Sequence, residues 1–309
     1  MRITLIAIAA LFGFSSLAAH AQSEDSAKTM SEPAKAVLVT GASSGIGKKI
    51  TEHLAGKGYF VYAGARKQAD IDMLNAIENV QALQLDVTKQ ADIDAAVKTI
   101  EDAGRGLHGL VNNAGVATLG FLTETSPKEF DLVMKVNAYG PYLVTRAFAP
   151  MIIEQKGRIT TIGSISGILA SERLGAYAMS KHAVEAFTDS LAKQMQPLGV
   201  EVSVIEPGNY DSEIGKNAAQ RTGVDSPIAD RSKYKQPDEV AAAAELALFG
   251  DNPKRRYMVV PNQREAEITI RKQIEQLVQL NEGQPYTYDR DALVKMLDEA
   301  LATSRPRSP

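Results

Sequence analysis

The sequence predicts an α/β protein, in which strands alternate with helices. Residues 36–40 (AVLVT) are a short, mostly β-branched run, which is typical of a buried strand. Three glycines follow, and residues 48–58 (KKITEHLAGKG) then have the pattern of a helix that ends at a glycine. Strand-like runs recur at residues 59–66 and 109–115, and the second of these leads into a tight turn.

The glycines at 41, 45 and 47 have the spacing G-x-x-x-G-x-G between the predicted strand and helix. Because glycine has no side chain, the backbone of such a turn can approach a pyrophosphate group. The start of the helix adds free N–H groups and the positive end of its dipole. A glycine-rich turn without a ligand is the alternative, but the position of these glycines between a strand and a helix favours a dinucleotide site. The predicted contacts in this turn are Gly41, Ser43, Ser44, Gly45, Ile46 and Gly47.

The second strand-like run, residues 59–66 (YFVYAGAR), indicates which dinucleotide is bound. A site that prefers NAD usually has Asp or Glu at the end of this strand, to hold the ribose 2′-hydroxyl. Ala65 stands there instead and Arg66 follows, so NADP(H) is favoured over NAD(H); a solvated surface arginine is the alternative. Asp86, at the end of a third strand, can accept hydrogen bonds from the adenine amino group. The turn after the fourth run supplies Asn113, Ala114 and Gly115.

Residues 175–195 have helical periodicity, which places Tyr177 and Lys181 on one face. An ammonium group beside a phenol lowers the phenol pKa, so Tyr177 can exchange a proton with a carbinol oxygen near neutral pH. Ser164 ends a predicted strand and can bind the same oxygen; Ser166 is a competitor whose spacing fits less well. Asn137 lies inside a predicted helix, where Asn is mildly unfavourable, so it is expected to hold water or backbone.

Six elements now stand in one order: T-G-A-S-S-G-I-G at 40–47, N-N-A-G at 112–115, Asn137, Ser164, Tyr177-x-x-x-Lys181 and Pro207-Gly208. Together they resemble the classical short-chain dehydrogenase/reductase family over about residues 34–262. The resemblance implies one doubly wound, Rossmann-type domain with a seven-stranded parallel sheet.

The resemblance also implies residue roles. Tyr177 would be the acid/base, and Lys181 would lower its pKa and hold the nicotinamide ribose. Ser164 would position and polarise the substrate oxygen, while Asn137 would hold a water in a proton relay. Further cofactor contacts are implied at Val87, Asn113, Pro207, Gly208 and Ser212.

Two departures from the family pattern affect these expectations. Residues 209–212 read NYDS, so Ser212 replaces the usual threonine, and Tyr210 and Asp211 give the nicotinamide wall an unusual composition. Some NADP-using members carry a basic residue where this chain has Ser44, so the preference for NADP rests on Arg66.

The C-terminal part is expected to exceed the family's core. Residues 209–236 are polar and correspond to the family's mobile substrate lid, and the segment after Pro237 reads as a helix. Residues 263–302 are predicted to form a helical extension with an amphipathic first helix, and residues 303–309 a disordered tail. The extension would serve packing or oligomer contacts, or cover an apolar substrate.

The first 21 residues have the pattern of an export signal. Arg2 precedes an apolar run at residues 3–17, and small residues flank His20 before a potential cleavage site at 21. Residues 1–21 are therefore predicted to be a signal peptide or an anchor, followed by a linker at 22–33. The protein would be periplasmic or secreted; membrane anchoring, or a cytoplasmic start at Met30, are the alternatives.

Composition narrows the function further. The chain has 309 residues, a net charge of −3 and no cysteine, so disulfides and thiol chemistry are excluded and nucleic acid is not an expected partner. Its four histidines have no metal-ligand spacing, so no metal is expected. The apolar run at residues 3–17 is short for a membrane span, so no stable span is expected either. We expect an NADP(H)-dependent carbonyl reductase or alcohol dehydrogenase, assembled as a homodimer or homotetramer. A catalytically silent NADP-binding sensor or scaffold is the alternative, and a serine hydrolase fits poorly.

Overall fold

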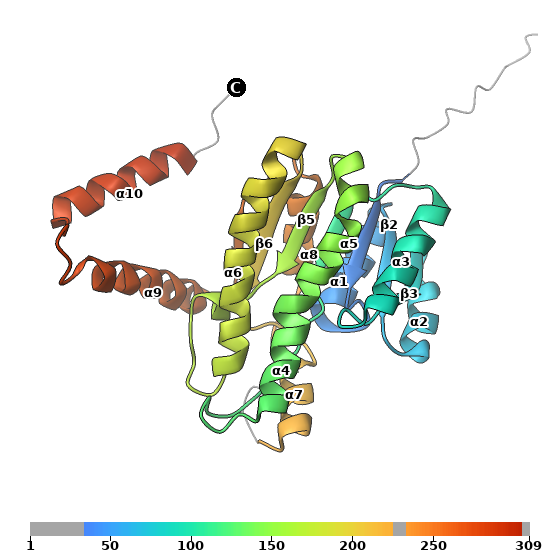
Figure 1. Ribbon diagram of the computed structural model, residues 1–309, viewed down its shortest axis with the longest axis horizontal. Helices are drawn as coiled ribbons and strands as arrows, with labels where there is room; N and C mark the ends of the chain where they lie inside the picture. The colour runs from blue at the N-terminus through green and yellow to red at the C-terminus, as the bar shows by residue number, and fades with distance from the viewer. Residues whose placement is uncertain (1–33, 225–232, 305–309) are drawn as a thin grey trace, which may run out of the picture. The chain divides into compact units, whose positions relative to one another are not determined.

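The computed structural model describes residues 34–224 and 233–304, so the predicted signal peptide and linker lie outside the described residues. Seven parallel strands form one sheet in the order β3-β2-β1-β4-β5-β6-β7 (Figure 1). The strands are β1 (Ala36–Thr40), β2 (Phe60–Ala65), β3 (Val80–Gln84), β4 (Gly109–Asn112), β5 (Arg158–Ile162), β6 (Glu201–Pro207) and β7 (Arg256–Val259).

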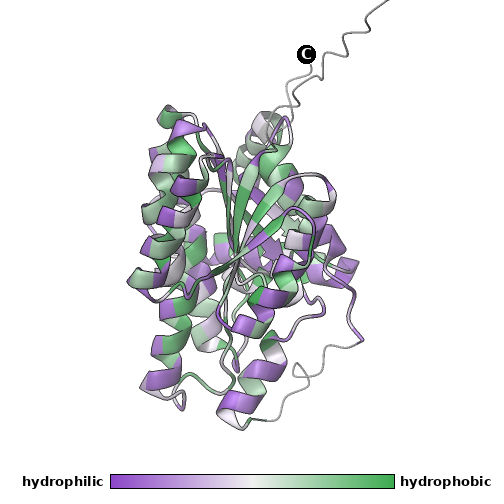
Figure 2. Ribbon diagram, turned by 90° about the vertical axis from the view of Figure 1, so that its right-hand side faces the viewer, coloured by the Kyte–Doolittle hydropathy of each residue, from purple (hydrophilic) through white to green (hydrophobic). Residues whose placement is uncertain are grey.

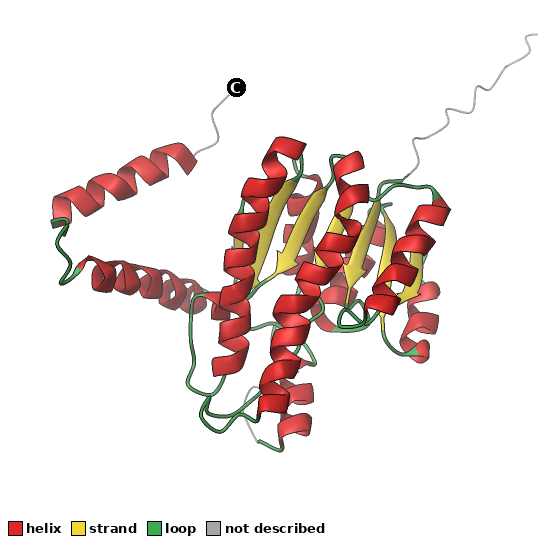
Figure 3. Ribbon diagram, in the orientation of Figure 1, coloured by secondary structure: helices red, strands yellow, loops and turns green. Residues whose placement is uncertain are grey.

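Helices cover both faces of the sheet (Figure 3). One face packs against α1 (Gly45–Gly56), α2 (Gln68–Asn75) and α8 (Asp238–Phe249). The other packs against α3 (Gln90–Ala103), α5 (Gly140–Glu154) and α6 (Gly175–Met195). A strand buried on both faces has no solvent side, which explains why β1 is apolar almost throughout and fully buried. Figure 2 shows hydrophobic strands between helices whose polar residues face outward.

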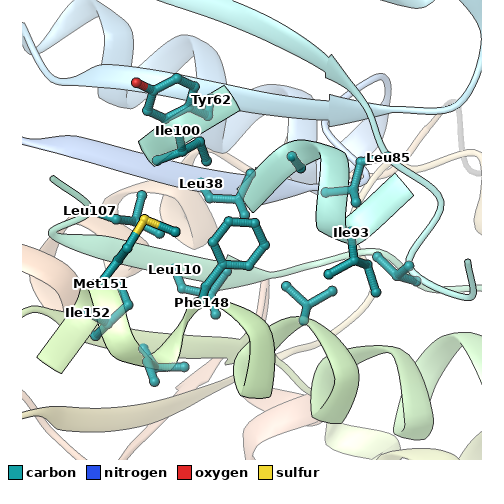
Figure 4. Packing of buried hydrophobic residues seen from close by; sticks show 14 of the residues in the cluster. Leu38, Tyr62, Leu85, Ile93, Ile100, Leu107, Leu110, Phe148, Met151 and Ile152 are labelled. Atoms are coloured by element: carbon teal, nitrogen blue, oxygen red, sulfur yellow. The ribbon is translucent and has the colours of Figure 1, made fainter. Parts of the chain in front are cut away.

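The larger core lies between the sheet and the second helix layer (Figure 4). Phe148 of α5 points toward Leu38 of β1 and Leu110 of β4, and all three side chains are fully buried. Removing such an aromatic ring from a packed core costs about 3–5 kcal/mol, so this contact is a main source of stability.

The strand order reverses between β1 and β4, which lie side by side although α1, β2, α2, β3 and α3 separate them in the chain. Helices α1 and α2, which connect β1 to β2 and β2 to β3, lie on one face of the sheet, and α3, which leads to β4, lies on the other. In open α/β sheets, ligands bind beyond the carboxyl ends of the strands at this reversal. The turns after β1 and β4 therefore mark the expected site, and the doubly wound fold predicted from the sequence is confirmed.

Helix α4 (Pro127–Met134) begins at Ser126, whose side chain accepts a hydrogen bond from the Glu129 N–H. It continues through one π-helical turn, Lys135–Tyr139, directly into α5. Such turns are rare and occur often at functional sites. This one contains Asn137.

The C-terminal extension is helical, with α9 (Gln263–Asn281) and α10 (Arg290–Ser304). Helix α10 thus continues two residues into the stretch predicted as a disordered tail. The polar segment expected to correspond to the substrate lid contains a helix, α7 (Ile214–Thr222), and residues 225–232 of that segment lie outside the described residues. Within the described ranges, no helix combines the length and apolarity that crossing a membrane requires.

Candidate active site

The turn after β1 is shaped by its glycines. Gly41 has φ +65°, and a Cβ atom there would lie 2.8 Å from the Ala114 Cα atom. A Cβ atom at Gly47 would lie 2.2 Å from the Gly41 carbonyl oxygen and 2.3 Å from Asn113 Nδ2. No side chain fits at either position, so the turns after β1 and β4 approach each other only because both residues are glycine.

The first turn of α1 is open to a ligand. Ser44 is its N-cap residue, is exposed, and makes no capping hydrogen bond through its side chain within the described part of the chain. Ser43, Gly45 and Ile46 are half-buried beside it, and a Cβ atom at Gly45 would lie 3.1 Å from Ser212 Cβ. Free N–H groups at a helix start bind phosphate well, so this cradle fits the pyrophosphate of a dinucleotide.

Thr40 ties this cradle together. Its hydroxyl oxygen accepts hydrogen bonds from the N–H groups of Asn113 and Ala114, each at 3.0 Å. The Asn113 side chain donates to the carbonyl oxygens of Thr40 at 2.8 Å and Gly41 at 3.0 Å. Thr40 belongs to the motif at 40–47 but was not among the predicted cofactor contacts. The available signal was a hydroxyl residue at the end of an otherwise apolar strand.

Arg66 and Asp86 lie just beyond the adjacent strands β2 and β3. Arg66 is exposed and directly follows β2, a strand that ends in Ala65 and has no Asp or Glu. Asp86 accepts hydrogen bonds from the Thr88 N–H at 3.0 Å and hydroxyl at 2.7 Å. Burial raises the Asp86 pKa, but the bonds from Thr88 and the charge of Arg66 outweigh this and hold it below its usual range. Val87 is buried, and its Cγ2 atom lies 2.8 Å from where a Gly140 Cβ atom would be.

Lys181 is the most constrained of the predicted catalytic residues. Its side chain is buried, and Nζ donates a 2.7 Å hydrogen bond to the Ile162 carbonyl oxygen at the end of β5. Nζ lies 5.7 Å from the centroid of the Tyr177 ring. It also lies 3.9 Å from where a Cβ atom of Gly115 would be. Helix α6 thus brings the ammonium group, the phenol ring and the turn after β4 together.

The pKa of Lys181 is lowered to about 8, because burial disfavours its charge more than the carboxylate of Glu185 favours it. The ammonium group is therefore close to losing its proton near neutral pH. A group of this kind responds strongly to charge placed nearby, whether from ligand or from protein.

Ser164 begins a short 3₁₀ turn, Ile165–Gly167, directly after β5. It is buried, and its hydroxyl oxygen accepts a 3.0 Å hydrogen bond from the Ser166 N–H. This bond leaves the hydroxyl proton unused, so Ser164 can donate to a substrate oxygen. The competitor Ser166 thus contributes its backbone to orienting Ser164.

Asn137 is buried and turned inward from the π-helical turn. Its amide oxygen accepts from the Val116 N–H at 2.9 Å, and its amide nitrogen donates to the Val116 carbonyl at 2.8 Å and to Ser180 Oγ at 2.9 Å. The interpretation that Asn137 holds backbone agrees with this geometry. It links the segment after β4 to α6, next to Tyr177.

The wall after β6 differs from the sequence-based interpretation. Tyr210 is not part of the pocket wall: it is buried in the core and donates a 2.5 Å hydrogen bond to Glu239 of α8. Its aromatic ring suits that core, and its hydroxyl has a partner there. The Gly208 N–H donates to the Val259 carbonyl at 2.8 Å, next to Pro207. Glu265 of α9, not anticipated, accepts from the Asn209 N–H at 2.8 Å.

An apolar layer surrounds Tyr177. Leu174, Ala117 and Leu119 pack there with Ile214 and Ala218 of α7. Arg221, at the end of α7, binds Glu129 of α4 at 3.0 Å and also the Ala117 carbonyl. Helix α7 is thereby tied to α4 and to the segment after β4, beside Tyr177. Outside the gap at 225–232 and the two termini, no three His, Asp or Glu side chains are grouped to hold a metal ion.

The comparisons define the class of protein. A model of the short chain dehydrogenase family matches residues 35–223, which is more than half of the chain. The chain therefore belongs to the short-chain dehydrogenase family of oxidoreductases.

Two relatives are similar to this chain in sequence. It is 41% identical over 186 residues to D-beta-hydroxybutyrate dehydrogenase, mitochondrial, of Bos taurus, covering 57% of this chain and 54% of the relative. This chain thus spans about half the length of that relative. It is 32% identical over 231 residues to the uncharacterized oxidoreductase YbbO of Escherichia coli K12, covering 73% and 85%.

The structural neighbours have bound different cofactors. A short chain dehydrogenase/reductase from Burkholderia phymatum, in complex with NAD, has a TM-score of 0.71 at 24% identity, covering 83% of this chain and 99% of its own. An alcohol dehydrogenase from Thermococcus sibiricus, complexed with 5-hydroxy-NADP, has a TM-score of 0.64 at 26% identity, covering 73% and 95%. These two structural neighbours thus differ in the cofactor bound, NAD in one and 5-hydroxy-NADP in the other.

Proposed function

We propose that this protein is an NAD(P)(H)-dependent oxidoreductase that interconverts an alcohol and a carbonyl, with Tyr177 as the acid/base. The observation that carries this proposal is the position of Lys181. Its buried ammonium lies 5.7 Å from the Tyr177 ring centroid and bonds the Ile162 carbonyl. A cation held there favours the phenolate form of Tyr177, so the phenol can exchange a proton near neutral pH.

The neighbouring side chains support this role. Ser164 donates its unused hydroxyl proton to the substrate oxygen and holds it near Tyr177. Asn137 holds the segment at Val116 and the hydroxyl of Ser180, and so keeps the turn after β4 in place beside α6. A bound nicotinamide cofactor supplies or accepts the hydride.

The cradle between β1 and α1 fits the cofactor's pyrophosphate. Its free helix start and glycines accept a group of this charge and size, and Asp86 faces the adenine side. Arg66 supports NADP(H) over NAD(H), because its guanidinium can pair with a 2′-phosphate. Ser212 and the turn after β4 would line the nicotinamide end.

Tyr177→Phe tests the enzymatic role. The ring is kept and only the hydroxyl is lost, so we expect NADPH binding to persist while turnover of a panel of aldehydes and ketones is lost. Tyr142→Phe, an exposed tyrosine on α5, is the matched control. If the wild type binds NADPH and turns over no carbonyl or alcohol, the sensor or scaffold hypothesis replaces this one.

Arg66→Ala tests the cofactor preference. A charge-assisted hydrogen bond contributes about 1.5–3 kcal/mol, so its loss weakens NADPH binding about tenfold or more. NADH affinity is expected to stay the same, because NADH has no 2′-phosphate. Arg105→Ala, an exposed arginine that lies over the Phe60 ring, is the control. Equal weakening of both cofactors by Arg66→Ala contradicts the preference.

The layer around Tyr177 supports a substrate with an apolar group next to the reacting carbon. Its side chains are Leu174, Leu119, Ala117, Ile214 and Ala218. We expect kcat/KM to rise with the length of an aliphatic chain, by up to tenfold for each two buried methylene groups. Higher activity on hydroxybutyrate than on longer, uncharged alcohols contradicts this expectation.

Export, domain organisation and assembly are also proposals. We infer that residues 1–21 direct export, that residues 34–262 form the catalytic domain and that residues 263–302 extend it. Mass spectrometry of the native N-terminus tests export: a start at Gln22 supports it, and a start at Met30 contradicts it. Light scattering of the purified protein tests the expected homodimer or homotetramer.

A further inference from the structure

Two glutamates lie directly behind the proposed catalytic residues. Glu206, next to the end of β6, is 2% exposed and points to the face of the sheet that α6 covers. Glu185 lies on α6, one turn after Lys181. Arg256 of β7 lies beside both, with Nε 3.0 Å from Glu185 Oε2 and 3.7 Å from Glu206 Oε1.

The hydrogen bonding of these carboxyl groups is incomplete. Glu185 Oε1 and Glu206 Oε1 are both buried, and no donor among the described residues reaches either oxygen. The two carboxyl groups nonetheless approach the same Arg256 Nε atom, and both the charge of Glu185 and hydrogen bonding with it raise the pKa of Glu206. Ionised carboxylates only accept hydrogen bonds, and two of them side by side repel. One proton between them supplies the missing donor and removes one of the two charges.

The pair adjoins both Ser164 and Lys181. A Cβ atom at Gly163 would lie 3.2 Å from Glu185 Oε1, and one at Gly167 would lie 3.0 Å from it. These glycines flank the turn that carries Ser164, so the carboxyl group packs directly against that turn. The charge of Glu185 also raises the pKa of Lys181, against the effect of burial.

We propose that Glu185 and Glu206 share one proton at neutral pH and act as positioning residues for Lys181 and the turn that carries Ser164. With the proton, the pair has one negative charge beside Arg256. Without it, the pair has two, and the ammonium of Lys181 is stabilised further.

The other groups around the pair are consistent with this arrangement. Helix α6 contributes Lys181 and Asp189, and Asp189 binds Arg256 at 2.9 Å. The end of strand β5, Ile162, and the following Gly163 pair with β6 beside Glu206 and carry no charge. The pKa of Glu206 is raised to about 8, mainly by burial and secondly by the charge of Glu185, which together outweigh the opposite effect of Arg256. The shared proton is therefore lost in the range in which Lys181 also titrates.

Infrared spectroscopy of the full chain tests the shared proton without any activity. Below pH 8 the wild type is expected to show the carbonyl stretch of a protonated, buried carboxylic acid, and above it to lose this band. Glu206→Gln and Glu185→Gln lack the band, because the new amide donates an N–H to the remaining carboxylate. Glu245→Gln, whose parent carboxylate bonds His53 at 2.6 Å, keeps the band and is the control. Absence of the band from the wild type, or its persistence in both glutamine variants, overturns the proposal.

The effect on Lys181 rests on the proposed function and has its own readout. Glu206→Gln cannot acquire the second charge, so the alkaline limb of the pH profile of turnover is expected to shift to lower pH. The limb of Glu245→Gln stays in place. An unchanged limb in Glu206→Gln overturns the positioning role. A wild type without turnover overturns the proposed function instead, and leaves the infrared result to decide the shared proton.

Discussion

Replacing Asn137 with alanine removes both partners of the Val116 peptide groups. Asn137 binds the Val116 N–H at 2.9 Å and the Val116 carbonyl at 2.8 Å, and it is 1% exposed. Each buried polar group left unpaired costs about 1–3 kcal/mol. Val116 is half-buried, so water reaches it in part, and we expect a total loss of about 2–4 kcal/mol. The Ser180 hydroxyl keeps its bond to the Tyr177 carbonyl.

Asn281 provides a matched control. It binds the N–H of Tyr288 at 2.9 Å and its carbonyl at 2.8 Å, in the same two-bond arrangement, but these bonds are exposed. Water replaces the lost partners there, so Asn281→Ala should change stability by less than about 0.5 kcal/mol. Both variants lose two hydrogen bonds, so a difference between their losses of stability is due to the burial of these bonds and not to their number.

Thermal unfolding followed by circular dichroism measures both effects. For a domain of this size, 1 kcal/mol corresponds to about 2–4 °C in Tm, so Asn137→Ala should unfold about 5–12 °C lower. Turnover at a temperature at which the variant is folded should also fall, because the turn beside Lys181 loses its anchor. Equal Tm values for Asn137→Ala and the wild type, or an equal loss in Asn281→Ala, would refute the reasoning.

Three further predictions concern the site and its charges. Gly47→Ala should abolish NADPH binding measured by fluorescence titration, because its Cβ atom would lie 2.2 Å from the Gly41 carbonyl, while Gly56→Ala, with nothing within 4 Å, should bind normally. Arg221→Ala should raise KM more than it lowers kcat, because α7 loses its bonds to Glu129; an unchanged KM contradicts this. The pKa of Lys181 is about 8 in the fold and 10.5 in the unfolded chain, so the unfolded chain holds more protons between these values. The wild type should therefore gain stability relative to Lys181→Met as pH rises through this window, and a constant difference in Tm contradicts it.

The elements that sequence analysis identified best are those with local patterns. The bounds of β1 were predicted without error, because a β-branched run between a charged residue and a glycine leaves little choice. Tyr177 and Lys181 were placed on one helix face from their spacing alone, and α6 bears this out. Helix α7 was missed, because its segment is polar and its packing against Leu174 and Tyr177 depends on residues distant in the chain.

Tyr210 illustrates the limit of motif comparison. By position it belongs to the nicotinamide wall, but its side chain is buried and bonded to Glu239. Adjacent residues of a loop can point in opposite directions, and only the packing of α8 decides which way this ring turns. Ser212, two residues further on, lies on the side of Gly45, where a Cβ atom would be 3.1 Å from the Ser212 Cβ atom.

The sequence by itself determined the α/β class, the strand and turn that begin the cofactor cradle, and the identity of the proposed catalytic residues. These depend on short-range periodicity and on glycine, whose effects act within a few residues. Only the tertiary structure decided that Thr40 ties two turns together, that Asn137 holds Val116, and that Glu206 reaches Glu185. Each of these contacts joins residues more than 20 positions apart, and each forms only after the strands take their order in the sheet. Side chains that meet in this way have no common local pattern, so their chemistry follows from packing.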